Sequence, residues 1–450
     1  METGEYRRMD AGRRERVLAA AVAAGLLGAE QVAAGFLDVD GVRESVGELR
    51  TAFGAAPVLH TFAVKAAPLV PLLRLLADAG MGCEVASPGE LAIALAAGVP
   101  VGRIVLDSPA KSAGELAQAL DLGVAVNADN LQELARIAEL VEDASTRSVL
   151  GLRVNPQVGV GSIGAMSTAS EHSKFGVPLR DPGARKRVVA AFERHPWLSR
   201  IHVHVGSQGC PLDLIAAGVR EAWELAEEVN ERAGRQQVST LDLGGGLPVN
   251  FQDEQVRPTY AEYVAELGAA VPGLFDGRYG LVTEFGRSLV AKNGFTAARV
   301  EYTKVVGGRR IALTHAGAHL ATRTVFMPDA WPLRVSVHRP DGVRRLSGEE
   351  PQDVAGPCCF AGDLVARGRT LPRIEPGDLV VLEDTGGYYT SAPWGYNSIA
   401  RPAVHGFSTA GGGVRFATVR RRQTPAEVVA EAGGDRPDAL TGLDSPGDPG

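Results

Sequence analysis

Residues 58–65, VLHTFAVK, decide the fold, because an apolar, β-branched run typical of a buried strand leads up to a single lysine, Lys65. Seven similar runs follow as far as residue 287, and patterns with apolar residues three and four apart, typical of helices, separate most of them. These runs are MGCEVAS (81–87), RIVLDS (103–108), GVAVNAD (123–129), SVLGLRVN (148–155), RIHVHVG (200–206), STLDLGGG (239–246) and GLVTEFGR (280–287). Eight strand–helix repeats predict an α/β fold with a (β/α)8 TIM-type barrel, and an open doubly wound sheet is the alternative.

The pattern changes after residue 290. Residues 295–317, 333–347 and 376–389 contain strand-like runs joined by glycine turns, which predicts a C-terminal antiparallel β-domain. The final stretch, 432–450, is rich in Gly, Pro and Asp and predicts a disordered tail. We therefore expect an N-terminal helical extension at 1–34, the barrel at 35–290, the β-domain at 291–420 and the tail at 425–450.

The composition narrows the possible partners. The net charge of −7 argues against nucleic acid or an anionic membrane. Residues 13–31 place a short apolar run after basic residues, as a signal peptide does, but acidic residues surround it and an amphipathic helix is expected. The four cysteines are too few for a disulfide scaffold, and two of them are adjacent, which favours the cytoplasm. No metal site is expected.

Lys65 suggests the chemistry. It is one of six lysines among 46 basic residues, and it ends a predicted barrel strand, where barrel active sites form. The ends of later strands carry His202, His204, Gly244, Gly245, Gly246, Glu284, Gly286 and Arg287. Glycine amides and an arginine suit a phosphate, and a phosphate-bearing cofactor that bonds to a lysine is pyridoxal phosphate. We expect the apolar strand to lower the Lys65 pKa so that a Schiff base forms.

The motifs resemble those of the fold-type III pyridoxal-phosphate decarboxylases, the family of diaminopimelate, ornithine and arginine decarboxylases, whose barrel is related to that of alanine racemase. The resemblance covers about residues 35 to 410, and the motifs follow in the family's order. They are FAVKA (62–66), EVASPGEL (84–91), DSPAK (107–111), SKFG (173–176), HVHVGSQ (202–208), DLGGGLP (242–248), EFGRS (284–288), GPCCFAGD (356–363) and DTGGYYTSAPWGYN (384–397). Glu84 stands where the family more often has Asp, and Ala67 replaces the usual Asn.

The resemblance implies a role for each matching residue. Lys65 would carry the cofactor, His204 would stack on its ring, and Glu284 would pair with the pyridine nitrogen. The phosphate would be held by Ser207, Gly245, Gly246, Gly286, Arg287 and Tyr388. Cys359 would protonate Cα after CO2 leaves, and it would reach the site from the other subunit of a homodimer. Arg323 falls where diaminopimelate decarboxylases place an arginine for a substrate carboxylate.

One position departs from the family's pattern. In the amine-selective members an acidic residue follows the catalytic cysteine and binds the distal ammonium of the substrate, but Phe360 stands there in this chain. An aromatic ring offers an apolar wall or a cation–π face instead of a charge. Asp363 is retained and is a candidate for partial compensation. We therefore expect an amino-acid substrate other than diaminopimelate, ornithine or lysine, with an apolar, aromatic or carboxylate-bearing side chain.

Two other readings stay open. An amino-acid racemase or epimerase is the nearest, but alanine racemases set an arginine against the pyridine nitrogen, so Glu284 favours decarboxylation. A non-catalytic regulator is the other, although regulators of this type tend to lose cofactor residues, and Lys65, Arg287 and Cys359 are all present. The expected protein is a decarboxylase that acts on a small molecule and contacts neither nucleic acid nor membrane.

Overall fold

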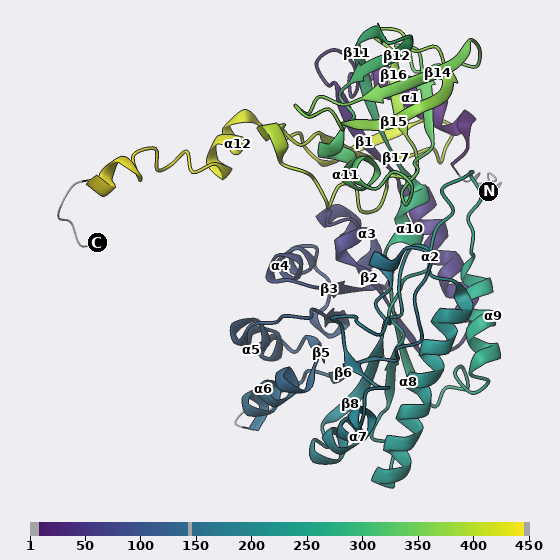
Figure 1. Ribbon diagram of the computed structural model, residues 1–450. Helices are drawn as coiled ribbons and strands as arrows, with labels where there is room; N and C mark the ends of the chain where they lie inside the picture. The colour runs from purple at the N-terminus through teal and green to yellow at the C-terminus, as the bar shows by residue number, and fades with distance from the viewer. Residues whose placement is uncertain (1–8, 143–145, 445–450) are drawn as a thin grey trace.

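Eight parallel strands close into a barrel in the computed structural model, which describes residues 9–142 and 146–444 (Figure 1). The strands are β2 (Val58–Ala63), β3 (Gly82–Val85), β4 (Ile104–Leu106), β5 (Ala125–Ala128), β6 (Leu150–Asn155), β8 (Leu198–Val203), β9 (Thr240–Asp242) and β10 (Gly280–Phe285). β10 pairs in parallel with both β9 and β2, which closes the ring. The prediction of a barrel is confirmed, and the open sheet is excluded.

Helices surround the barrel strands. They are α2 (Val39–Phe53), α3 (Val70–Asp78), α4 (Pro88–Ala96), α5 (Ala113–Leu122), α6 (Leu131–Glu142), α7 (Ala184–Arg194), α8 (Leu212–Ala233), α9 (Tyr260–Ala270) and α10 (Arg287–Val290), with the short β7 (Val177–Pro178) beside β6. Local signals fix several helix starts: Ser87 caps α4, and Ser112 with Glu115 forms a capping box on α5. The main apolar core lies in the layer between strands and helices.

The interior of the barrel is largely polar toward the active-site end. Asn127 on β5 donates to Asp242 on β9 over 3.1 Å, and Arg153 on β6 donates to Asp107, directly after β4, over 3.0 Å. Neither pair joins neighbouring strands, so these side chains meet inside the barrel. The side chains of Val105 on β4, Ala125 on β5 and Val282 on β10 form a small apolar cluster.

A second sheet forms the β-domain above the barrel (Figure 1). Its strands are β1 (Ala33–Asp38), β11 (Gly294–Val306), β12 (Arg309–Thr314), β13 (Val335–His338), β14 (Glu349–Ala355), β15 (Leu364–Pro372), β16 (Leu379–Leu382), β17 (Ala403–Ser408) and β18 (Arg415–Arg420), with α11 (Ala318–Phe326) between β12 and β13. Most pairings are antiparallel, as predicted, but β1–β17 and β12–β14 are parallel.

The N-terminal segment belongs to the β-domain, which corrects the predicted boundary at residue 35. β1 lies between β11 and β17, because its apolar sequence supplies a strand to that sheet. The helix α1 (Ala11–Ala23) packs Val17 and Leu18 against the same sheet. Arg13 at the start of α1 also bonds Asp38 at the end of β1. The barrel therefore begins after residue 38.

The segment 425–450, predicted as a disordered tail, contains a helix among its described residues. Residues Pro425–Glu431 form α12, because Thr424 and Glu427 make a capping box at its start. This segment projects away from both domains (Figure 1). Residues 445–450 of the predicted tail lie outside the described residues. Among the described residues, no helix has the length and apolar character needed to cross a membrane.

Candidate active site

Lys65 lies directly after β2, in a short turn of 3₁₀ helix formed by Val64–Ala66. Its Nζ is 2.8 Å from each carboxylate oxygen of Glu84 on the neighbouring strand β3. The Lys65 side chain is 42% accessible, while that of Glu84 is fully buried. The lysine side chain therefore keeps accessible surface at the strand end. An amine there is within reach of a bound molecule.

The expected effect of the strand on the Lys65 pKa is wrong. Burial does lower this pKa, as predicted, but Glu84 opposes it, and with Tyr388 and Glu284 it holds the pKa above its usual value. Burial also raises the pKa of Glu84 to about 8, against the effect of Lys65. Glu84 has one methylene more than Asp, the residue more common here in the family, and its carboxylate contacts the amine with both oxygens. Lys65 is therefore an ammonium paired with Glu84 in the protein alone.

The glycines after β8 and β9 make room where two strand ends approach each other. A Cβ atom on Gly246, whose φ is +91°, would lie 1.8 Å from the Gly206 carbonyl oxygen, and one on Gly245 would lie 2.0 Å from that of Glu284. The Gly245 amide donates to His204 Nδ1 over 3.1 Å. The Gly246 amide has no acceptor among the described residues. Gly246 is thus the better placed of the two amides to bind an anion.

Arg287 and Arg323 bring two positive charges to one place. The Arg287 guanidinium carbon is 4.3 Å from the centre of the Tyr388 ring, and that of Arg323 is 4.8 Å from the same centre. Nε and Nη1 of Arg287 and Nη1 of Arg323 are buried without a hydrogen-bond partner. Burial and the neighbouring Arg323 lower the pKa of Arg287 to about 10, although Tyr388 opposes them. Buried guanidinium groups with free donors call for an anion.

The β-domain supplies part of this anion site. Tyr388, in left-handed backbone with φ +67°, donates its amide to the Ala66 carbonyl over 2.6 Å, next to Lys65. Trp331 packs beneath both guanidinium groups at 4.7 and 5.0 Å. The Ser207 amide is taken by the Met166 carbonyl, so only its hydroxyl is available to a ligand. Gly286 caps α10 directly before Arg287.

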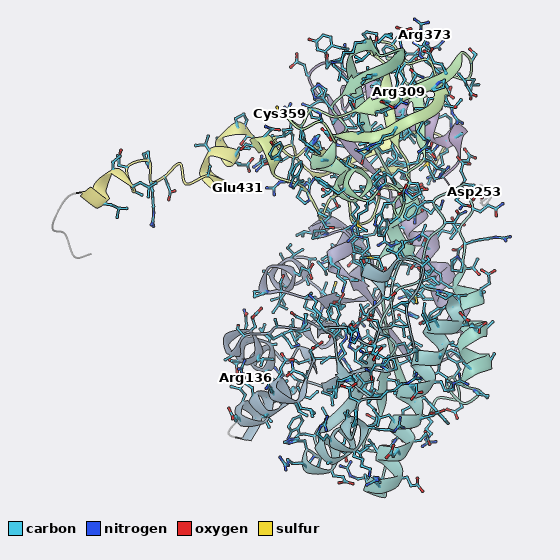
Figure 2. The ribbon with its side chains drawn as sticks, in the orientation of Figure 1. Arg136, Asp253, Arg309, Cys359, Arg373 and Glu431 are labelled. Atoms are coloured by element: carbon cyan, nitrogen blue, oxygen red, sulfur yellow. The ribbon has the colours of Figure 1, made fainter. Side chains whose placement is uncertain are left out.

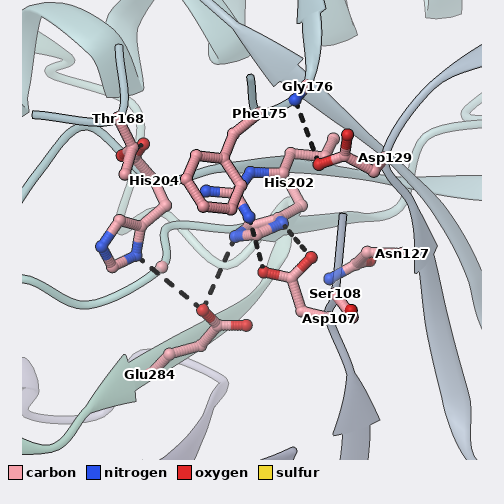
Figure 3. A network of polar contacts seen from close by, with 12 residues as sticks. Asp107, Ser108, Asn127, Asp129, Thr168, Phe175, Gly176, His202, His204 and Glu284 are labelled. Carbon is pink, nitrogen blue, oxygen red and sulfur yellow. Dashed lines mark hydrogen bonds and ion pairs between the residues drawn. The ribbon is translucent and has the colours of Figure 1, made fainter. Parts of the chain in front are cut away.

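Glu284 ends β10 within a buried network that Figure 3 shows from close by. Its Oε2 is 3.6 Å from His202 Nε2 and 4.0 Å from His204 Nδ1. Burial, followed by Arg153 and Lys65, holds the pKa of His204 well below its usual range, so this ring is neutral. Glu284 and His204 thus lie together at the ends of β10 and β8, two strands of the barrel.

The pyridoxal cofactor fits these residues on three observations. The unpartnered donors of Arg287 and the crowded glycine turn match a phosphate. An accessible amine lies at a strand end, and a buried carboxylate stands by a neutral imidazole. His202, His204 and Glu284 also place ligand-type atoms within 4.8 Å of one another. Because His202 lies between two buried carboxylates as an ion-pair partner, the groups of this set fit the organic cofactor.

The predicted catalytic cysteine, Cys359, belongs to the β-domain. Cys359 is exposed, and Figure 2 shows it at the edge of the β-domain, on the side from which the C-terminal segment projects. Its amide donates to Asn397 Oδ1 over 2.8 Å. Its neighbour Cys358 is buried, with Sγ 3.9 Å from His319 Nδ1. The predicted placement of Cys359 in the site therefore requires a second subunit.

Asp363 takes a different position from the one expected. Its carboxylate is buried and accepts the amides of Ala318 over 2.6 Å and Cys358 over 2.7 Å. These bonds occupy both oxygens and fix the loop that carries Cys359. Asp363 is therefore a loop anchor in this structure, and partial compensation for the acidic residue missing at Phe360 is not what its geometry supports.

Phe360 belongs to an aromatic cluster that we define as Phe326, Phe360, Trp394 and Tyr396. Its ring is stacked on Phe326 with centroids 5.6 Å apart and meets Trp394 edge-on at 5.2 Å. Trp394 and Tyr396 are stacked at 4.6 Å. Phe326 is 51% and Tyr396 41% exposed, so the cluster forms an accessible apolar surface beside Cys359.

Sequence reasoning missed the partners that surround the predicted site. Trp331, Trp394 and the interior residues Asp107, Arg153 and Arg200 were not singled out. A signal existed for Arg200: Arg200 and His202 alternate along β8 and His204 follows directly after it, and alternation places such side chains on one face of a strand. The aromatic partners come from a helix end and a loop far from Phe360 in the chain, which no local pattern reveals.

Comparison with known proteins gives the class. Residues 39–291 match the family described as "Pyridoxal-dependent decarboxylase, pyridoxal binding domain". The chain belongs to this family of pyridoxal-phosphate-dependent amino-acid decarboxylases, which are carboxy-lyases, and its cofactor is pyridoxal 5'-phosphate.

Particular relatives carry the name diaminopimelate decarboxylase. The protein from Pseudomonas fluorescens is 32% identical over 379 residues, 83% of this chain and 86% of the relative. That from Mycobacterium bovis is 30% identical over 413 residues, covering 88% and 89%. The crystal structure of diaminopimelate decarboxylase from Helicobacter pylori complexed with L-lysine superimposes with a TM-score of 0.78 at 25% identity, covering 90% of this chain and 97% of the other.

Proposed function

We propose that this decarboxylase acts on an amino acid whose side chain ends in an apolar, aromatic or carboxylate group and not in a free ammonium. The observation that carries the proposal is the position of Phe360 within the aromatic cluster beside Cys359. Removing an ammonium from water against aromatic rings, without a carboxylate partner, costs free energy, whereas burying an apolar group there gains it. The cluster therefore favours the second kind of side chain.

The residues of the protomer have separate tasks in this proposal. Lys65 would hold the cofactor covalently, and Arg287, Gly246, the Ser207 hydroxyl and Tyr388 would hold its phosphate. When bound, the cofactor supplies an electron sink for the pair left at Cα by departing CO2. His204, being neutral, offers a flat face for stacking, and the Glu284 carboxylate would hold a proton on the ring nitrogen. Glu84 would accept a proton from Lys65 when that amine must be neutral.

Cys359 is the proposed acid that protonates Cα. Because it lies at the edge of the β-domain, we propose a homodimer in which the cysteine loop of one subunit completes the site of the other. Asn397 and Asp363 support this task, because both bind amides of the loop and fix its shape. The aromatic cluster would enter the same site with Cys359 and form the wall against the substrate side chain.

Diaminopimelate is the second candidate substrate. The relatives named above favour it, and Arg323 lies beside Arg287 with an unpartnered buried donor that suits a second carboxylate. The distal ammonium of diaminopimelate, however, would meet Phe360. The two candidate substrates thus differ in the group that would contact Phe360, and a comparison of kcat/KM between them measures this difference.

The test is CO2 release by the cofactor-loaded protein across a panel of L- and D-amino acids and meso-diaminopimelate, with product masses recorded. Release from an apolar, aromatic or dicarboxylic member at a higher kcat/KM than from diaminopimelate is the expected result. A preference for diaminopimelate would overturn the proposed selectivity. Inversion or Cα–H exchange in D2O without CO2 release would instead indicate a racemase.

A further inference from the structure

His202 bridges two buried carboxylates in the interior of the barrel (Figure 3). Its Nδ1 is 3.4 Å from Asp107 Oδ1, and its Nε2 is 3.6 Å from Glu284 Oε2. The His202 side chain is fully buried, and Asp107 and Glu284 are 4% and 2% exposed. Asp107 is held from its other side by Arg153, whose Nη1 is 3.0 Å from Oδ2. The four residues form one chain that ends on Glu284.

Glu284 lies where a carboxylate tends to be protonated. Burial, and then the charge of Asp242, raise the pKa of Glu284, and Asp107 adds to the effect, while His202 opposes all three. Glu84 also stands near, since its carboxylate, that of Asp107 and that of Glu284 lie within 4.8 Å of one another. A protonated Glu284 could not stabilise a positive charge on a ring nitrogen. The site therefore needs a cation close to Glu284.

His202 is that cation. His204, the other histidine near Glu284, is neutral for the reasons given above, and among the described residues no lysine or arginine makes an ion pair with Glu284. Burial alone would lower the pKa of His202, but Asp107 and Glu284 together raise it to about 10. Conversely, His202 and Arg153 hold the pKa of Asp107 well below its usual range, although burial opposes them. His202 is thus an imidazolium at neutral pH.

We propose that His202 is a positioning residue: fixed by Asp107 and Arg153, its imidazolium keeps Glu284 ionised and turned toward the place of the cofactor's ring nitrogen. The proton shared by Glu284 and that nitrogen then stays on the nitrogen, because a proton on Glu284 would lie closer to the imidazolium. The effect reaches the reaction only through Glu284, since His202 has no exposed surface from which to touch a substrate.

Charged and acidic groups face this chain from several surrounding strands and turns. The cations are Lys65 on the turn after β2, Lys111 before α5, Arg153 on β6, and Arg200 and His202 on β8, and the acidic groups are Glu84 on β3, Asp107 directly after β4, Asp129 directly after β5, Asp242 on β9 and Glu284 on β10. Because His204 is neutral, removal of the imidazolium would take away the only cation that makes an ion pair with Glu284 among the described residues. This loss would favour protonation of Glu284, because a cation within about 4–6 Å shifts a carboxyl pKa by about 1–3.

The test compares His202→Gln with His60→Gln in the holoenzyme. His60 on β2 is also a buried barrel histidine bonded to β10, through Thr283 Oγ1 at 2.9 Å, but burial and Arg50 lower its pKa to about 4, so it carries no charge at neutral pH. Cofactor labelled with ¹⁵N in the ring reports protonation of its nitrogen by NMR without substrate. In His202→Gln we expect the signal to move toward that of unprotonated pyridine, and kcat to fall about tenfold or more with a smaller change in KM. In His60→Gln both should match the wild type.

A ring nitrogen that stays protonated in His202→Gln, with kcat unchanged, would overturn the proposal. If the variant does not fold, the wild-type holoenzyme labelled with ¹⁵N-histidine still decides, because Asp107→Asn identifies the His202 signal by its shift. A neutral imidazole at pH 7 in the wild type would also overturn the proposal. Since neither NMR measurement uses substrate, the outcome of these two measurements is independent of which amino acid the enzyme decarboxylates.

Discussion

Arg287 and Arg323 lie against the same two aromatic rings, Tyr388 and Trp331, with guanidinium carbons 4.3–5.0 Å from the ring centres. Two like charges come this close in a buried place only where an anion or electron-rich faces compensate them. The rings supply one part of that compensation, and the free donors leave room for the other. The pair therefore marks the end of the site that binds anions.

Substitution of the two arginines should have two different effects, one on cofactor binding and one on substrate binding. Arg287→Met should weaken binding of pyridoxal phosphate at least about tenfold, because a charge-assisted bond to the phosphate is lost. Arg323→Met should mainly raise KM for a carboxylate-bearing substrate. Titration of the apoprotein with the cofactor, followed by absorbance, measures the first effect, and initial rates measure the second. Arg136→Met, at an exposed arginine of α6, is the control. Equal cofactor affinity in Arg287→Met and the control would contradict this assignment.

Gly246 should not tolerate a side chain. In Gly246→Ala the Cβ would meet the Gly206 carbonyl at 1.8 Å in a backbone with φ +91°, so the turn must shift. We expect the free energy of unfolding to fall by about 3 kcal/mol or more, together with loss of cofactor binding. Urea unfolding and cofactor absorbance measure the two effects. Gly47→Ala, at an exposed helix position with open space around the Cβ, should instead raise stability by about 1 kcal/mol. A Gly246→Ala protein as stable as wild type would refute the crowding argument.

His202 and His60 should act on opposite limbs of the pH–stability curve. The folded-state pKa of His202 is raised to about 10, so its stabilisation is complete below the unfolded value of about 6.5 and is lost as pH rises through the folded value. That of His60 is lowered to about 4, so stability is lost as pH falls from about 6.5 toward that value. The slope for one proton is at most about 1.4 kcal/mol per pH unit. Urea unfolding from pH 4 to 10 should show a flatter alkaline limb in His202→Gln and a flatter acid limb in His60→Gln. Parallel curves for wild type and both variants would contradict the assigned charges.

The parts of this structure that follow local sequence patterns were predictable. The eight barrel strands follow from apolar runs of strand length, and Lys65, Glu284 and Arg287 stand where strand ends predict a site. The errors concern contacts between distant segments. β1 joins a sheet formed by residues from the opposite end of the chain. The Lys65 pKa depends on a contact with Glu84, which lies on the neighbouring strand β3. Neither relationship has a periodicity that a single sequence displays.

Shared active sites predict complementation between inactive variants. Lys65→Ala and Cys359→Ala should each be inactive, and purified mixed dimers should regain about one half of wild-type activity, because each mixed dimer has one intact site of two. Co-expression with two affinity tags and rate measurements on the doubly purified protein test this expectation. Cys358→Ala is the matched control, since that buried neighbour contacts His319 and should remain active alone. No recovery in mixed dimers would place Cys359 in the site of its own subunit or outside the reaction.

Phe360 should determine the preference for apolar over ammonium-bearing substrates, because its side chain carries no charge. Phe360→Glu introduces a carboxylate beside Cys359, so we expect kcat/KM for substrates with a distal ammonium to rise, and that for apolar substrates to fall, each by about tenfold or more. Phe360→Leu removes the ring without adding charge and should weaken the apolar preference without creating an ammonium preference. Competition between one substrate of each kind, followed by product mass, gives the ratio directly. An unchanged ratio in Phe360→Glu would show that the aromatic cluster packs the loop and does not face the substrate.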